Sequence, residues 1–150
     1  GRGLDTLTPE TYAELAGTAP TATEAKVDDK AFIQAMTTVV RNLHQQGNVV
    51  IIGRGANIIL PDNTLGVIHI GLMASLKVRV RTLMMGENLD ADEAQVYVEE
   101  LERAREAYFR KFFKVHPNEP GLYHLMLNMD KIPPQTAAEV VVHAARDLGS

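Results

Sequence analysis

The feature that most constrains the fold is a run of four apolar residues, 49–52, inside the stretch GNVVIIGRGANIIL at residues 47–60. In a strand, successive side chains point to opposite faces, so an uninterrupted apolar run needs cover on both faces. A second run of this kind, GVIHIGL, occupies residues 66–72. Strands that are apolar on both faces are typical of parallel sheets, so the two runs predict buried strands of an α/β protein.

Helical spacing of apolar residues precedes and follows these runs. In residues 28–47, Asp28 or Asp29 can cap the start of a helix and Gly47 its end. Further elements are expected in this order: a short helical turn at residues 56–60, helices from Ser75 to about residue 85 and from Asp90 to about residue 113, a third strand at 122–128, and a last helix at 133–149. Right-handed crossovers would place helices on both faces of a three-layer parallel sheet.

The N-terminal residues 1–30 are predicted to stand apart from a domain that we place at residues 31–150. The segment LTPETYAELAG, residues 7–17, predicts a short helix, because Pro9 suits a first helical turn. Residues 17–29 are rich in Thr and Ala and have little to bury, so they predict a loop.

Composition excludes several classes of function. The chain has 15 basic and 19 acidic residues and a net charge of −4, so we expect no nucleic-acid partner. The absence of cysteine excludes disulfides and thiolate metal sites and agrees with a cytoplasmic location. No apolar run approaches the roughly 20 residues of a membrane helix. The five histidines lack metal-ligand spacing, so no metal site is predicted, and His69 is expected to be a core residue.

The strongest candidate for chemistry is the tripeptide Gly53-Arg54-Gly55, which follows the first apolar run. Ligands of open α/β sheets bind at the carboxyl ends of strands, and the planar guanidinium of Arg54 suits a phosphate. A dinucleotide-binding fingerprint would need glycine where Ile58 stands. Two interpretations remain open here: a phosphate site, or a turn with a solvated arginine.

A second group of basic residues lies on the two middle helices: Arg79, Arg81, Arg103, Arg105, Arg110 and Lys111. Several arginines on a helical segment can neutralise a phosphoryl group during transfer. Glutamates at 99, 100, 102 and 106 interleave with them, so a solvated, salt-bridged face is the alternative.

Taken together, four blocks resemble the cytidylate kinase-like family, a branch of the P-loop nucleoside monophosphate kinases. The blocks are GNVVIIGRGANIIL, GVIHIGLMASLKVRV, LDADEAQVYVEELERAREAYFRKFF and EPGLYHLMLNMDKI, and the likeness covers about residues 30–148. The resemblance implies that Gly53, Arg54 and Gly55 lie near the nucleoside monophosphate and the transferred phosphate, and that Arg79 lies on the donor side.

The resemblance also implies roles for residues of the later blocks. Glu102, Arg105 and Arg110 match an acidic residue and phosphate-contacting arginines of the family's lid helix, and Asn128 matches the asparagine that closes the last strand. His124 stands where the family usually has Asp. The implied ligands are a nucleoside monophosphate or another phosphorylated small molecule, with ATP and Mg²⁺ as cofactors if the family activity is retained and none otherwise.

One family feature has no match in these 150 residues: the first, central strand with its glycine-rich phosphate loop. Backbone amides of that loop hold the donor phosphates, so we expect no transfer by this chain alone. Without the strand, the two apolar runs would expose or fuse their inner edges. Two alternatives stay open: an active nucleoside monophosphate kinase whose N-terminal part lies outside this sequence, or a non-catalytic homo-oligomeric module that uses strand edges and the aromatic residues at 108–113.

Overall fold

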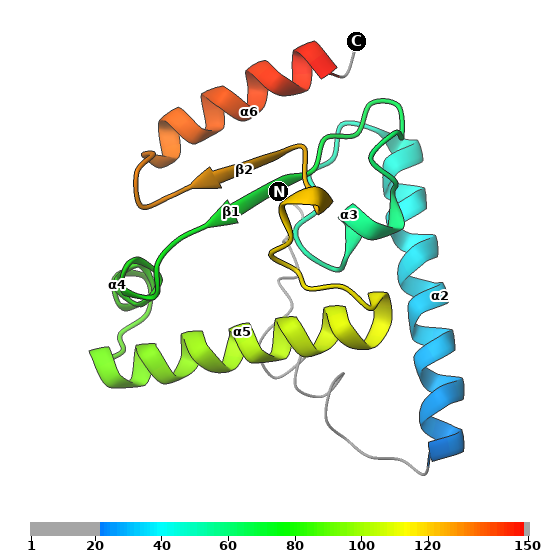
Figure 1. Cartoon of the computed structure of the whole chain (residues 1–150), viewed down its shortest axis with the longest axis horizontal. Coiled ribbons are helices and arrows are strands. Elements are labelled where there is room, and N and C mark those ends of the chain that lie inside the picture. The colour runs from blue at the N-terminus through cyan, green and yellow to red at the C-terminus, as the bar shows by residue number, and fades with distance from the viewer. Residues whose placement is uncertain (1–21, 149–150) are drawn as a thin grey trace. The chain divides into compact units, whose positions relative to one another are not determined.

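The computed structural model of the protein describes residues 22–148. These residues form five α-helices, one short 3₁₀-helix and two strands (Figure 1). They divide into two compact units: residues 22–60 with 104–117, and residues 61–103 with 118–148. The long helix α5 (Ala91–Phe113) contributes its first part to the second unit and its last part to the first. No helix in the described part of the chain is long and apolar enough to cross a membrane.

The first unit packs helix α2 (Ala22–Gln46) and the short helix α3 (Ala56–Ile59) with the last part of α5. Its core contains Met36 and Val40 of α2 and Tyr108 and Phe109 of α5, and Tyr108 is only 1% exposed. The Phe32 ring meets the Tyr108 ring edge-on, with 6.4 Å between their centroids. Tyr108 and Phe109 therefore belong to the core of this unit, and the half-buried rings of Phe112 and Phe113 pack against Tyr108.

Helix α2 begins earlier than expected. It starts at Ala22, so the predicted loop at residues 17–29 is wrong for its second half, and Asp28 and Asp29 are not caps. Ala, Glu and Lys in this segment favour helix, and Asp29 pairs with Lys111 of α5 at 2.9 Å. The predicted C-cap is confirmed, because Gly47 has a φ of 68°. The expected helix at residues 7–17 lies outside the described residues.

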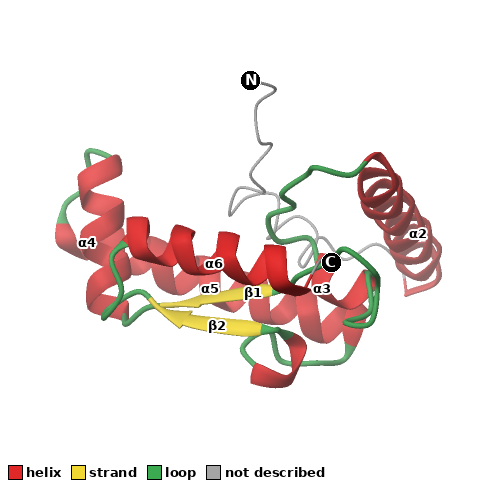
Figure 2. Cartoon of the chain, turned by 90° about the horizontal axis from the view of Figure 1, so that it is seen from above, coloured by secondary structure: helices red, strands yellow, loops and turns green. Residues whose placement is uncertain are grey.

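The second unit contains a parallel pair of strands, β1 (Ile70–Met73) and β2 (Leu125–Asn128), with Ile70 opposite Leu125. Helices α4 (Leu76–Gly86) and α6 (Pro134–Leu148) follow these strands, and the 3₁₀-helix η1 (Pro120–Leu122) precedes β2. Figure 2 shows α6 running alongside the strands. The first part of α5 buries Ala94 and Val98. The fold is thus mixed α/β and mostly helical, as the sequence predicts at this level.

The capping prediction for α5 is confirmed. The Asp90 carboxylate accepts a bond from the Glu93 backbone N–H at 2.9 Å, and the Glu93 carboxylate accepts one from the Asp90 N–H at 3.2 Å. This reciprocal pair satisfies two donors at the helix start. The Ser75 cap is also confirmed, because its hydroxyl accepts from the Val78 N–H at 3.4 Å.

The strand expected at residues 49–52 does not form, which corrects the first prediction. These residues have no strand assignment, and Val50 and Ile52 are 82% and 58% exposed. A strand needs a neighbour to receive its backbone hydrogen bonds, and the sheet in the described residues contains β1 and β2 alone. The second apolar run forms a strand only from Ile70 onward.

Candidate functional site

The tripeptide at residues 53–55 forms an unusual turn. Gly53, Arg54 and Gly55 all lie in the left-handed region, with φ of 71°, 60° and 68°. Glycine adopts this region freely, whereas a side chain such as that of Arg54 costs about 1–2 kcal/mol there. A strained residue of this kind persists only where the surrounding structure holds it.

Two aromatic residues of α5 hold this turn. The buried Tyr108 hydroxyl donates to the Arg54 carbonyl at 3.3 Å. The Phe113 ring occupies the space that a Cβ atom on Gly55 would need. Gly53 also accepts a bond from the Ala56 N–H at 3.2 Å, which leads the chain into α3. The position of Arg54 is therefore fixed by residues more than fifty positions away in the sequence.

The two arginines of α5 that the resemblance links to a phosphate differ in their surroundings. Arg105 is half-buried, donates to the Pro117 carbonyl at 3.4 Å and places its guanidinium 5.5 Å from the Phe109 ring centroid. It shares a face of α5 with Tyr108, three residues on, which contacts the turn. Arg110 is exposed and lies five positions from Arg105, hence on another face. Helix geometry thus assigns Arg105, rather than Arg110, to the side of α5 on which Tyr108 contacts the turn at residues 53–55.

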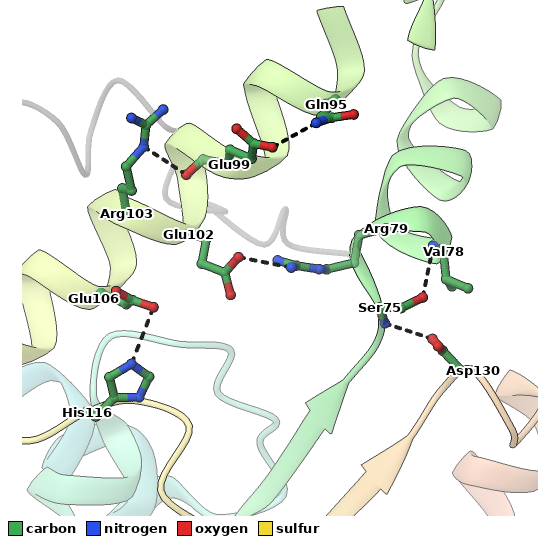
Figure 3. Close-up of polar contacts among 10 residues, drawn as sticks. All are labelled: Ser75, Val78, Arg79, Gln95, Glu99, Glu102, Arg103, Glu106, His116 and Asp130. Carbon is green, nitrogen blue, oxygen red and sulfur yellow. Dashed lines mark hydrogen bonds and ion pairs between the residues drawn. The ribbon is translucent and has the colours of Figure 1, made fainter. Parts of the chain in front are cut away.

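In the second unit, Arg79 and Glu102 form an ion pair at 2.9 Å, which joins α4 to α5 (Figure 3). Both side chains are 33% exposed. The Arg79 Nε atom is buried and has no hydrogen-bond partner. Pairing with Glu102 uses one of the five N–H donors of the guanidinium, so Arg79 retains donors for a further acceptor.

The carboxyl ends of the two strands are joined by polar contacts around Asp130. Its carboxylate accepts from the Ser75 N–H at 2.8 Å (Figure 3). Its own N–H donates to the Asn128 side-chain oxygen at 3.0 Å. Hydrogen bonds from the backbone and side chain of Ser75 lower the pKa of Asp130 below its usual value. The structure thus places Asn128 in the turn that follows β2, where its side chain bonds the backbone.

The amino ends of the strands are joined by two histidines. The His69 backbone N–H donates to His124 Nδ1 at 2.8 Å, and the His124 backbone N–H donates to the His69 carbonyl at 2.8 Å. His124 Nε2 lies 3.2 Å from the Asp62 carbonyl oxygen, which makes Nε2 the protonated nitrogen of the ring. His69 is a buried core residue, as predicted.

The predicted site residues therefore fall into two groups. Gly53, Arg54 and Gly55 belong to the first unit with Arg105 and Arg110, and Arg79, Glu102 and Asn128 belong to the second. Sequence reasoning missed the hydroxyl of Tyr108 as a support for the turn and Asp130 as a link between strand ends. Among residues 22–148, no three His, Asp or Glu side chains are grouped as metal ligands.

Comparisons with known proteins agree with the resemblance drawn from the four blocks. The model of the cytidylate kinase-like family matches residues 4–131. A crystal structure of an uncharacterized protein from Eubacterium ventriosum superposes with a TM-score of 0.70 at 18% identity, over 92% of this chain and 81% of that chain. A search of curated proteins found no significant match.

Proposed function

The chain belongs to the cytidylate kinase-like family, and from this premise we propose that it carries the acceptor-side half of a nucleoside monophosphate kinase site. In this proposal Arg54 binds the phosphate of a nucleoside monophosphate or of a related phosphorylated small molecule. Gly53 and Gly55 serve by allowing the backbone to turn left-handed on either side of the arginine.

The observation that carries the proposal is the strained conformation of Arg54. A turn that served only the fold could place glycine or asparagine at this position at lower cost. Instead an arginine is held with φ of 60°, and the Tyr108 hydroxyl binds its carbonyl. Strained residues of this type cluster at ligand sites, because strain there fixes a functional group in advance.

We propose supporting roles for the remaining arginines. Arg105 would help to neutralise the phosphate from α5, where the Phe109 ring orients its guanidinium. Arg110 is exposed and would reach a phosphate only from the other face of the helix. Arg79 pairs with Glu102 and keeps further N–H donors, but because no phosphate loop accompanies it, we propose no donor nucleotide for it in this chain. Asn128 would keep the turn after β2 in place.

We further propose that the two-stranded sheet is the remaining part of a three-layer sheet of the P-loop kinase type. The exposure of Val49, Val50 and Ile52 supports this, because that run lacks a neighbouring strand in the described residues. Residues 1–150 contain no match to a phosphate loop. The backbone amides of such a loop would hold the donor phosphates of ATP, so we propose that this polypeptide does not transfer a phosphoryl group by itself.

Binding calorimetry with CMP, dCMP and ATP tests the proposal. We expect CMP or dCMP to bind and ATP to bind weakly or not at all. The variant Arg54→Asn removes the charge while keeping a residue that tolerates the left-handed region. Because hydrogen bonds to charged groups contribute about 1.5–3 kcal/mol, its affinity should fall about 10- to 150-fold.

Arg103→Gln provides the matched control, because it removes one positive charge from an exposed position on α5. Equal affinities of the Arg54→Asn and Arg103→Gln proteins would overturn the phosphate role of Arg54. Measurable transfer of phosphate from ATP to CMP by the 150-residue chain would overturn the assignment of no turnover.

A further inference from the structure

A shallow open groove lies along the first part of α5. Its lining consists of the apolar or aromatic residues Leu89, Val96 and Tyr97 and the acidic residues Asp92, Glu93 and Glu100. Spacings of three and four residues place these side chains along one side of the helix. Val96 is 54% exposed, whereas Ala94 and Val98 face the core. The groove thus combines apolar side chains with three carboxylates.

Helix α4 of the same unit carries a strip of opposite charge. Lys77, Arg81, Met84 and Met85 follow one another at spacings of four, three and one, so they lie on one side of the helix. All four are exposed, and Met85 is 83% exposed. No residue of α4 is buried among the described residues. Neither Lys77 nor Arg81 forms a salt bridge within the described part of the chain.

We propose that the α5 groove is the docking site for the α4 strip of a second copy of this chain. The two surfaces complement each other in charge, since two cations face three carboxylates, and each presents an exposed apolar side chain, Val96 in the groove and Met85 in the strip. One unit carries both surfaces, so a two-fold axis lets each copy insert its strip into the groove of the other. Each contact is then made twice, and the pairing closes as a dimer.

Sedimentation velocity of the whole chain from about 5 to 500 µM tests this, a range that brackets weak dimers. We expect a concentration-dependent dimer that weakens as salt rises, because exposed charges are screened. The strip variant Lys77→Glu/Arg81→Glu and the groove variant Asp92→Lys/Glu100→Lys should each weaken self-association at least about tenfold, since each contact occurs twice and like charges meet. Glu93 is left unchanged because it caps α5.

Mixing the two variants gives the sharpest result. In the mixed dimer, the acidic strip of one copy meets the basic groove of the other, and the remaining contact has the original charges. We therefore expect the mixture to dimerise where each variant alone is monomeric. The control Glu139→Lys/Asp147→Lys makes the same change in charge as the groove variant, but on α6. It should dimerise like the unsubstituted chain. A monomer at all concentrations, or a dimer that neither variant weakens, would overturn the proposal; circular dichroism confirms that each variant is folded.

Discussion

The contact between Gly55 and Phe113 permits a controlled test of how the turn at residues 53–55 is held. Gly55→Ala adds one methyl group at a residue with φ of 68°, where that group would meet the Phe113 ring. Gly47 has the same φ of 68°, but a Cβ atom there meets nothing within 4 Å. The pair of substitutions therefore shares the backbone cost and differs in the contact alone.

The expected magnitudes follow from these two contributions. Gly47→Ala should destabilise the protein by about 1–2 kcal/mol, the cost of an L side chain in the left-handed region. Gly55→Ala adds an overpacking cost of about 1–3 kcal/mol, because Phe113 is itself packed against Tyr108 and Phe109. We expect Gly55→Ala to lower the free energy of unfolding by about 2–5 kcal/mol in total.

Urea unfolding followed by far-UV circular dichroism measures both values. Phe113→Leu completes a double-mutant cycle, since a smaller side chain leaves room for the new methyl group. The double variant Gly55→Ala/Phe113→Leu should be more stable than the sum of the two single changes predicts. Equal losses for Gly47→Ala and Gly55→Ala, with additive behaviour in the cycle, would show that Phe113 does not hold the turn.

Three further predictions concern hydrogen bonds within one or the other of the two units. Tyr108→Phe removes the hydroxyl that binds the turn, so we expect a loss of about 0.5–1.5 kcal/mol in urea unfolding and weaker CMP binding in calorimetry. His124→Phe leaves the His69 N–H without its acceptor and should cost about 1–3 kcal/mol, whereas His124→Asn, which keeps an acceptor, should cost less. Asp130 has a lowered pKa, so its contribution to stability is present above its ordinary value of 3.8 and is lost as pH falls through the folded value; Asp130→Asn should flatten the decline of the urea midpoint below about pH 4.

The sequence predicts best where the determining interactions are local. Asp90 and Glu93 lie three residues apart, and their reciprocal bonds at the start of α5 follow from that spacing. Gly47 likewise ends α2 through its own backbone freedom. In both cases the partner atoms lie within one helical turn, so the pattern of residue types contains the needed information.

Prediction fails where a partner is distant in the sequence. The apolar run at residues 49–52 has the composition of a strand. A strand also needs a neighbouring strand to receive its backbone hydrogen bonds, and no strand of the described residues pairs with this run. The left-handed turn at residues 53–55 could not be predicted for the same reason, since the conformation of Arg54 depends on a hydrogen bond from Tyr108, 54 positions away. The tripeptide alone indicates a turn, and only the contacts of α5 determine its conformation.

The strain at Arg54 leads to a prediction that separates function from stability. Asparagine tolerates the left-handed region better than arginine does, so Arg54→Asn should leave the free energy of unfolding unchanged or raise it by up to about 1 kcal/mol. The same variant should lose most of its CMP affinity, because the phosphate loses its cation. Stability gained together with binding lost is expected where a strained residue is kept for its function. If urea unfolding instead shows that Arg54→Asn is destabilised by more than about 1 kcal/mol, the arginine stabilises the fold, and the strain argument for a phosphate role is refuted.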